Sequence, residues 1–444
     1  AVGGAYRKEK LDQHSEDVLA TGDLVGGNGP VPSVSGARDV YAIFSEASIP
    51  LYTGLEMQLA ARWDSYKNDF KGQATDNSFK RVSPKIGLRY QASKEILVRS
   101  SFARGFRAPT LFENLRPFTE GGNTSGSYSD PIRCNADGTP KSIPTSPVGA
   151  LQDECRIQQT TATKGEANLN PEKSTQYSLG FVFAPTNNFS GSIDYWHVKI
   201  KDAIVAQSEI QVFGDPSKYQ ANFVRYDPAV YPNGYSLDGG LAGLNGQVAG
   251  LYPGSTNPLF PIAYVYLPYL NTANKIAAGL DINLNYKTKA GDWGQFGVTL
   301  DGTYFTKHSY QYTGVASTSD NGAYGDFGAA PRWRHTLTGN WARGVWGFSV
   351  TQNFTAGYRD FIDGTQKDNP DYQKDRRVAS NTTVDILGTW RGVKNLDLAL
   401  GVKNLFDRDP PSSRTTQNFQ FGYDATLTDP RGRIYYLTAK YKFL

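Results

Sequence analysis

The last twelve residues of the chain alternate strictly between two kinds of side chain. One side carries Tyr435, Leu437, Ala439, Tyr441 and Phe443, and the other carries mostly polar residues. Residues two apart share a face of a β-strand, so this segment predicts a strand between an apolar and an aqueous medium. Because the apolar face is mainly aromatic and lies at the end of the chain, the pattern is typical of the last strand of a membrane β-barrel.

Composition indicates an all-β chain. The 444 residues include 46 glycines, 27 tyrosines, 23 phenylalanines and 7 tryptophans, and the mean hydropathy is -0.48. Glycine favours turns, and aromatic residues favour strands. No stretch approaches the roughly 18 consecutive apolar residues of a membrane helix, which excludes a helical membrane protein. A barrel strand exposes only alternate residues to lipid, so a polar average is compatible with a membrane.

The same period-two alternation recurs along the chain, for example in Leu280–Tyr286 and Leu396–Val402. Short and long connections follow one another in turn. The long ones cover about residues 12–35, 105–173, 202–275, 310–331, 359–378 and 407–429. Antiparallel strands connected in this way turn tightly at the periplasmic face and carry long loops at the extracellular face. We expect about 14 strands, a short helix near residues 202–207 and an extra strand around residues 263–269.

The net charge and the two cysteines limit which kinds of partner and which cellular compartment are expected. The formal net charge is +4, and the 46 basic and 42 acidic residues are interspersed, so no nucleic-acid partner is expected. Cys134 and Cys155 lie in a long polar segment away from histidine-rich sequence. Paired cysteines of this kind favour one disulfide in an oxidising compartment, with two unrelated free thiols as the alternative. We expect no metal and no cofactor.

No catalytic set stands out in the sequence. The four histidines, His14, His197, His308 and His335, fall in four separate segments, so we expect no enzyme. An acidic loop, Asp360–Asp375, matches no ordered calcium-loop spacing. Its lysines and arginines offset the charge, which favours a solvated loop.

Three motifs occur in order at the ends of expected strands. They are Gly105-Phe-Arg-Ala-Pro109 with the turn Leu111–Leu115, Asn168-Leu-Asn-Pro-Glu-Lys-Ser174, and Gly401-Val-Lys-Asn-Leu-Phe-Asp407. Together with the aromatic last strand, they resemble the TonB-dependent outer-membrane receptors over most of the chain. The resemblance implies an all-β, transmembrane antiparallel β-barrel of 22 strands around an N-terminal plug. Residues 1–444 would then be the C-terminal portion of that barrel.

The resemblance also implies what lies outside the chain. No signal peptide opens it, so we expect the plug, its energy-coupling TonB box and the first strands to precede Ala1. Pro109 would end an ascending strand, and Pro171 would begin a descending one, because proline cannot donate to a central ladder. We expect these motif residues to shape loop edges without touching a ligand.

The function that the resemblance implies is ligand-gated, energy-coupled import of a scarce nutrient across the bacterial outer membrane. An iron–siderophore complex and an oligosaccharide or peptide are both open as the nutrient. The implied partners are outer-membrane lipid and lipopolysaccharide, a TonB-type energy-transducing protein acting through the plug, and a surface lipoprotein. The alternatives are a passive porin-like channel or an adhesin of about 14 strands, and a fragment that pairs with a separate chain because two open edges would otherwise face lipid.

Aromatic residues in the long extracellular loops are the candidate ligand contacts. Tyrosine combines a flat apolar ring with a hydroxyl, which suits stacking on a sugar ring or on an aromatic chelate arm. The alternative is that the loops use these rings to pack against each other. The candidates are Arg116, Phe118, Tyr128, Tyr226, Tyr231, Tyr235, Tyr252 and Tyr324.

Overall fold

Strands dominate the computed structural model, and their order follows the chain. The structure describes residues 1–17, 32–70, 78–124, 126–142, 154–225, 261–313, 316–325, 328–360, 375–414 and 422–443. Within these residues, no helix has the length and apolar character needed to cross a membrane.

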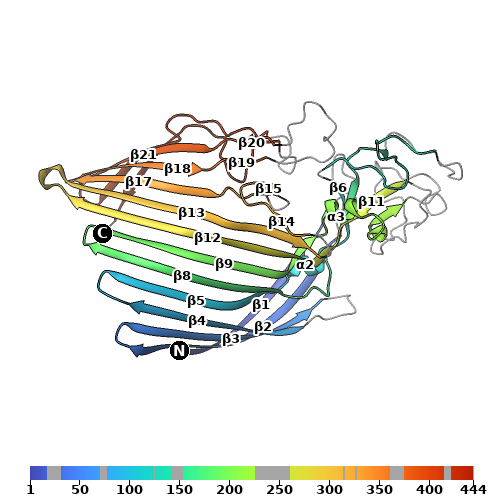
Figure 1. Cartoon of the computed structure of the whole chain (residues 1–444), viewed down its shortest axis with the longest axis horizontal. Coiled ribbons are helices and arrows are strands. Elements are labelled where there is room, and N and C mark those ends of the chain that lie inside the picture. Colours follow the sequence, from blue (N-terminus) through green and yellow to red (C-terminus); the bar gives the residue numbers. More distant parts are fainter. Residues whose placement is uncertain are drawn as a thin grey trace.

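One large antiparallel sheet runs through the molecule (Figure 1). Fourteen strands form its path, and each pairs with the strands before and after it, which confirms the expected number. They are β1 (Val2–Gln13), β2 (Val34–Tyr52), β3 (Leu55–Asp69), β4 (Phe79–Gln91), β5 (Ile96–Arg107), β8 (Glu172–Thr186), β9 (Phe189–Ala206), β12 (Tyr269–Lys289), β13 (Gln295–Tyr312), β17 (Trp333–Arg343), β18 (Trp346–Thr355), β21 (Asn381–Val393), β22 (Leu396–Lys403) and β23 (Ile434–Tyr441).

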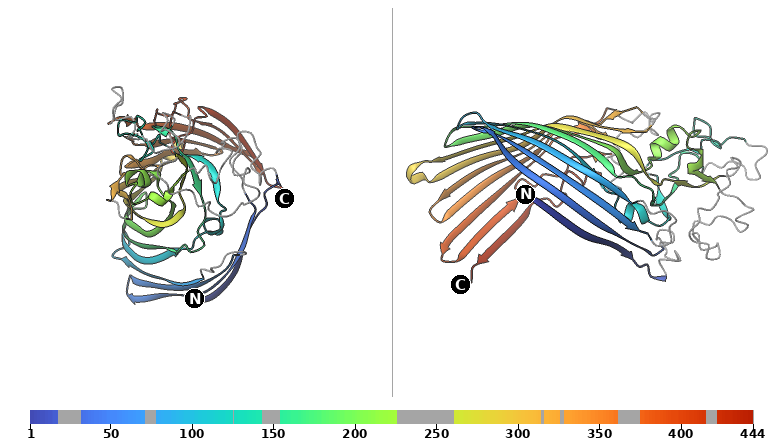
Figure 2. Two further views of the ribbon diagram at one scale, coloured as in Figure 1. Left: turned by 90° about the vertical axis from the view of Figure 1, so that its right-hand side faces the viewer. Right: turned by 90° about the horizontal axis from the view of Figure 1, so that it is seen from below.

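The sheet is curled but open. Figure 2 shows it wrapped around a central axis, with its first and last strands diverging from each other. Among the described residues, β1 pairs only with β2 and β23 only with β22. Two edges of the sheet therefore carry backbone groups that no strand of this sheet satisfies.

Short and long connections lie at opposite ends of the sheet, as predicted (Figure 1). Short turns use residues that tolerate a left-handed backbone, such as Gly54 (φ 78°), Gly344 (φ 55°) and Asn395 (φ 65°). The short-turn end also holds η4 (Gly291–Trp293). The elements of the long loops are α2 (Leu111–Leu115), β6 (Thr119–Asn123), β7 (Thr160–Thr163), α3 (Glu209–Gly214), η2 (Gln220–Asn222), β10 (Phe223–Arg225), β11 (Ile262–Tyr266), β14 (Thr318–Ser319), β15 (Tyr324–Gly325), β16 (Gly328–Ala329), β19 (Tyr358–Arg359) and β20 (Arg377–Val378).

The helix expected at residues 202–207 is misplaced. Strand β9 continues to Ala206, because Ala203 and Ile204 pair with β12, and the helix α3 starts only at Glu209. The extra strand expected around residues 263–269 is confirmed as β11.

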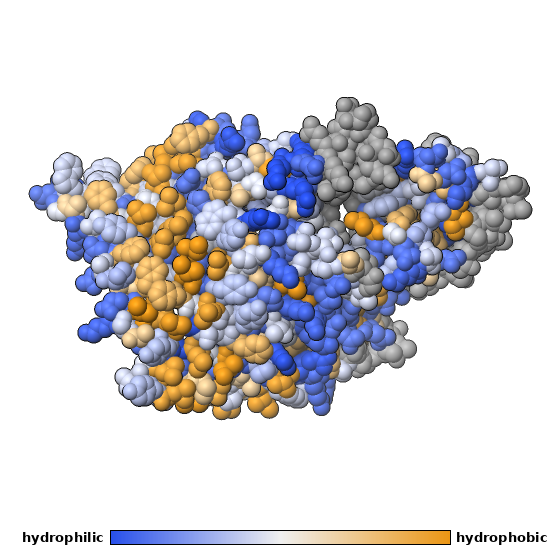
Figure 3. Space-filling view, in the orientation of Figure 1, coloured by the Kyte–Doolittle hydropathy of each residue, from blue (hydrophilic) through white to orange (hydrophobic). Residues whose placement is uncertain are grey.

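The two faces of the sheet differ in polarity, as the alternation predicted. Leu284 and Leu398 lie on the outer face, whereas Asp281 and Asp397 have the opposite parity and turn to the inner face. Figure 3 shows a band of apolar side chains that runs across the strands, with polar side chains toward both ends. Leu400 and Leu437, opposite each other in register, are 61% and 71% exposed. Such a surface is stable only against lipid.

The buried apolar clusters lie at the long-loop end instead. One joins Ala203 and Ala273 to Tyr310 and Tyr312, and another joins Val212 of α3 to Phe223, Val265 and Leu267. Protein packing therefore orders the loops, whereas the strands' outer face needs an apolar solvent.

A charge on the outer face should destabilise the barrel, and the same charge on the inner face should not. We expect Ile282→Lys to lower the free energy of unfolding in liposomes by about 2–4 kcal/mol, the cost of a cation near the bilayer midplane. The matched control is Asn283→Lys, which places the cation beside Asp301 on the inner face. Equal losses in the two variants would contradict the assignment of the faces.

Candidate functional site

Two long loops meet in a small sheet beyond the end of the barrel strands (Figure 1). Strands β6 and β7 come from the loop after β5, and β10 and β11 come from the loop after β9. The order is β10-β11-β7-β6, and the central pair is parallel, with Val265 opposite Thr161. We call these four strands the loop sheet. It combines two segments that are about a hundred residues apart into one surface.

Covalent and ionic cross-links hold the loop sheet together. Cys134 and Cys155 form a disulfide, as predicted, with their Cα atoms 5.8 Å apart. The neighbouring Arg133 is fully buried and pairs with Glu154. These two contacts close the loop after β5 on itself.

A buried ion pair joins the two loops. The guanidinium of Arg225, in β10, donates to both oxygens of Asp130 at 2.7 and 2.9 Å. The side chains of Arg225 and Asp130 are only 3% and 1% exposed. A bidentate pair of this kind fixes both distance and orientation. Removal of Asp130 would take a bidentate counter-charge away from the buried guanidinium of Arg225.

Two of the predicted ligand residues pack against β11 and the first residue of β12. The guanidinium of Arg116 lies between the rings of Phe112 and Tyr269, 5.5 and 5.9 Å from their centres, and donates to the Tyr269 hydroxyl at 3.3 Å. The ring of Phe118 contacts Tyr264 and Tyr266, with centres 5.6 and 6.3 Å apart. The structure therefore places Phe118 against β11 of the loop sheet and Arg116 against the start of β12.

The other predicted ligand residues are dispersed. Tyr128 stacks on Phe213 of α3, with ring centres 4.1 Å apart, and its hydroxyl lies 3.3 Å from Glu209. Tyr324 is half-buried in the hairpin of β15 and β16, in a different loop. Four more lie outside the described residues: Tyr226, Tyr231, Tyr235 and Tyr252.

Packing between loops, the alternative reading of these aromatic residues, accounts for the contacts of Arg116, Phe118 and Tyr128 within the described structure. Ligand contact by these residues stays a prediction. Their rings and charges nevertheless gather at the long-loop end of the barrel.

A salt-bridge latch fastens the base of the first of these loops. Arg107, at the end of β5, donates to Glu113 at 2.8 and 2.9 Å and to Glu172 at 2.9 and 2.6 Å. Glu172 also accepts from the amide of Ile204 at 2.8 Å. Thr110 and Glu113 form a capping box at the start of α2. We call Arg107, Glu113 and Glu172 the rim latch, because it ties β5, α2, β8 and β9 together.

The rim latch also sets the ionisation of Glu113. Burial acts to raise its pKa, but hydrogen bonds from Arg107 and from the Thr110 amide, together with the Arg107 charge, leave the pKa below its usual value. The sequence motif predicted the strand end at Pro109 but missed the latch. The spacing Thr110-x-x-Glu113 was the available signal.

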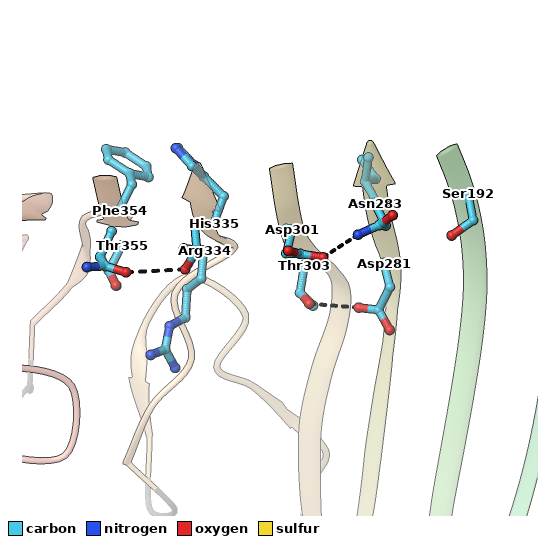
Figure 4. A pocket seen from close by; sticks show the side chains of 13 residues that line it. Ser192, Asp281, Asn283, Asp301, Thr303, Arg334, His335, Phe354 and Thr355 are labelled. Atoms are coloured by element: carbon cyan, nitrogen blue, oxygen red, sulfur yellow. Dashed lines mark hydrogen bonds between the residues drawn. The ribbon is translucent and has the colours of Figure 1, made fainter. Parts of the chain in front are cut away.

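The inner face of the barrel is a polar wall (Figure 4). Across β12 and β13, Thr303 donates to Asp281 at 2.7 Å, and Asn283 donates to Asp301. A hollow of about 410 Å³ opens on this wall. Further residues that line it are Ser192, Gly302, Arg334, Thr336, Asn353 and Thr355. Ile282, His335 and Phe354 also border it, although their parity is that of the outer face.

The polar wall extends beyond this hollow. Asn353 donates to Asp385 at 3.0 Å, and Arg99 forms two hydrogen bonds of 2.7 Å with Asp194. Figure 4 shows His335 and Phe354 directed away from Arg334, as their parity requires. Among the described residues, no group of three His, Cys, Asp or Glu side chains is placed to hold a metal ion. The wall therefore offers hydrogen bonds to water and to polar solutes.

The chain belongs to the family of TonB-dependent receptor-like β-barrels, whose model matches residues 1–405. Proteins of this family are outer-membrane receptors and transporters, not enzymes. The ferric enterobactin receptor of Pseudomonas aeruginosa is 25% identical over 180 residues, which are 40% of this chain and 20% of that protein.

Solved structures share the fold at low identity. A mutant of the Pseudomonas aeruginosa ferric enterobactin receptor, in complex with enterobactin, has a TM-score of 0.60 at 17% identity and covers 100% of this chain and 51% of its own. The siderophore receptor PirA from Acinetobacter baumannii has a TM-score of 0.57 at 14% identity, with coverages of 100% and 52%. The chain thus spans about half the length of these structures.

The buried pair between the loops should be energetically important. We expect Asp130→Asn to lower the local free energy of opening of β10 and β11 by about 3–5 kcal/mol, because the buried Arg225 would lose this bidentate counter-charge. Amide hydrogen exchange of the loop sheet measures this loss. Asp429→Asn is the matched control, since Asp429 pairs with Arg431 on the exposed surface and should leave exchange unchanged. Equal exchange in both variants would contradict the role of the pair.

The rim latch predicts loosening of α2 in acid. Because folding lowers the pKa of Glu113, its contribution is fully present above the ordinary value of 4.5 and is lost as the pH falls through the folded value. Amide exchange of α2, corrected for intrinsic rates, should therefore accelerate below that range. Glu113→Gln should exchange faster at neutral pH and show little further change in acid. An acid response as large as that of the unmodified protein would refute this assignment.

Proposed function

We propose that this chain forms the barrel part of an outer-membrane receptor that imports a scarce nutrient. The observation that carries the proposal is the loop sheet, a cross-linked surface held over the end of a barrel with a polar inner wall. A passive pore needs only the polar wall. A binding surface that is already ordered before the ligand arrives loses less conformational entropy when the ligand binds.

The nutrient that we propose is an iron–siderophore complex. Family membership supports an outer-membrane receptor, and the relatives named above include a ferric enterobactin receptor and a siderophore receptor. The loop residues Arg116 and Phe118 provide a cation beside the start of β12 and an aromatic ring beside β11. Such groups suit a chelate with aromatic and anionic arms. An oligosaccharide or peptide is the second candidate, because the same rings can stack on sugars.

Import against a gradient requires energy, which we propose comes from a TonB-type inner-membrane partner acting on a plug. The chain covers about half of its solved relatives, so the plug and further strands would belong to the rest of a longer protein. The open edges of the sheet at β1 and β23 support this arrangement, because unpaired strand edges are unfavourable in lipid.

The proposal predicts energy-dependent uptake that depends on the loop sheet. Iron-starved cells that make the full-length protein should take up a labelled ferric siderophore, and deletion of the energy-transducing partner should abolish uptake. Arg116→Gln should weaken ligand binding about tenfold, the usual effect of losing a charged hydrogen bond. Arg431→Gln, at an exposed pair in another loop, is the matched control.

The outcomes separate the alternatives. Unchanged uptake without the partner would indicate a passive pore. Expression that responds to a glycan instead of to iron starvation, with uptake of that glycan, would replace the siderophore by a carbohydrate. Equal ligand affinity in Arg116→Gln and Arg431→Gln would remove Arg116 from the ligand site.

A further inference from the structure

The loop after β5 crosses the inner face of the sheet before it reaches the loop sheet. Its short helix α2 contacts both β1 and β2 (Figure 1). Val40 of β2 is 2% exposed, whereas Ile43, on the opposite parity, is 59% exposed on the outer face. Gly36 and Arg38, which contact the loop, share the parity of Val40. We call residues 105–116 the strap, because they lie across part of the opening from inside.

One buried guanidinium fastens the strap to β2. Arg38 donates to the carbonyl oxygen of Pro109 and, at 2.6 Å, to the carboxylate of Glu9. The side chain of Arg38 is 8% exposed. A charged donor to a carbonyl in such a buried place forms a strong hydrogen bond. Glu9 also accepts from Arg7, which forms no described contact with the strap.

A small apolar cluster completes the fastening. Leu111 and Leu115 of α2 are buried with Phe70, and Leu11 of β1 packs against them. A Cβ atom at Gly36 would lie 2.3 Å from the Cδ1 atom of Leu115, so glycine permits the close approach of the strap. Because the cluster is small, the strap can separate from β1 and β2 at a lower free energy than the strands can unfold.

The ladder between β4 and β5 ends before it reaches the strap. Its last pair toward the long loops is Lys85 with Ala103, although β4 begins at Phe79 and β5 continues to Arg107. The next residue of β4 in that direction, Pro84, lacks the amide N–H that a ladder needs. We call this unpaired stretch between the two strands the seam. Within the described structure, the end of β5 is therefore paired with β8 alone.

Aromatic rings close the seam in place of backbone hydrogen bonds. Phe106 of β5 contacts Phe79 of β4 and Tyr66 of β3, with ring centres 6.3 and 5.9 Å apart. The guanidinium of Arg38 lies 5.2 Å from the centre of the Tyr66 ring. The fastening and the seam therefore share one neighbour.

The strap is attached more firmly on the side of β8. Arg107 of the rim latch pairs with Glu172, the first residue of β8. The amides of Gly165 and Glu166, which precede β8, donate to carbonyl oxygens of the strap at 2.8 and 3.0 Å. The strap is thus hinged on the β8 side and fastened on the β2 side.

We propose that the strap is a hinged closure of the opening: it opens as a unit when Arg38 releases Pro109, and import of the nutrient requires this opening. The seam lets the end of β5 turn without loss of a strand ladder. The capping box of Thr110 and Glu113 keeps α2 formed during the movement. The requirement for import rests on the proposed function, whereas the opening itself does not.

The first experiment measures the opening in intact cells that make the full-length protein. Both native cysteines of this chain form the disulfide, so Leu115→Cys adds a free thiol, at a position that is 3% exposed. Its rate of labelling by a membrane-impermeant maleimide reports the opening, and the protein without this substitution gives the background. The test variant adds Arg38→Gln. The matched control adds Arg7→Gln, which removes a cation from the same Glu9 but leaves the bond to Pro109.

We expect Arg38→Gln to accelerate labelling by about tenfold to a hundredfold, the effect of losing a buried charged hydrogen bond. Arg7→Gln should change the rate little. Heat-dependent electrophoretic mobility verifies that each barrel is folded. Equal rates in the two variants, or no labelling of Leu115→Cys in either, would overturn the inference.

The second experiment holds the strap closed. Gly36→Cys and Leu115→Cys are joined by a short bifunctional thiol reagent. The matched control joins Ser45→Cys to Ala61→Cys, which lie opposite each other on the paired strands β2 and β3. We expect the linked strap to bind a labelled ferric siderophore but to import it no faster than cells without the energy-transducing partner. The linked control should bind and import it normally.

The two experiments separate the inference from the proposed function. Normal import through the linked strap would overturn the inference while the proposed function stands. If the unmodified protein imports no siderophore, the proposed function fails, and the labelling rates still decide whether the strap opens on release of Arg38.

Discussion

Backbone hydrogen bonding in lipid is the constraint on which this structure depends. Water is absent from the hydrocarbon core, so each strand must pair with a neighbour, and the pairing fixes the side to which every residue points. In β5, β8 and β9 the register runs without a shift over the paired strand bodies, which keeps Arg99 and Asp194 inside while Phe102 and Tyr177 stay outside. A slip of one residue would exchange the two sets. The polar wall and the apolar band are thus two consequences of one register.

The long loops are stabilised differently. They lie in water, so they must bury apolar side chains against each other. Ordering two long segments costs conformational entropy. The disulfide, the buried pair of Asp130 and Arg225 and the apolar cluster around Val265 oppose that cost. The rim latch then connects this ordered surface to the ends of the barrel strands. The loop sheet and the inner wall are therefore connected through the strand ends.

Features that depend on local sequence could be predicted. Alternation in β12 and β22 identified strands and faces, and the alternation of short and long connections identified the two ends of the sheet. The helix near residue 202 was misplaced, because the pairing of Ala203 and Ile204 with β12 involves residues about seventy positions away. Short-range sequence patterns do not indicate a strand-pairing partner at that separation.

The same limit explains the parts of the site that sequence reasoning missed. Arg225 and Asp130 are 95 residues apart, and Arg107 and Glu172 are 65 apart. Nothing near either position specifies its partner. The alternation over Leu280–Tyr286 predicts that Asp281 lies on the polar face, but its place in a hollow depends on β13 and β17, which also line that hollow.

The most direct test of the account is a scan of solvent around β12 in the full-length protein reconstituted in lipid. Single spin labels along Leu280–Asn285 are probed with oxygen, which concentrates in lipid, and with a nickel chelate, which stays in water. The account predicts collisions with oxygen at positions 280, 282 and 284 and with the chelate at 281, 283 and 285. The same solvent at all six positions, or the reverse assignment, would contradict it.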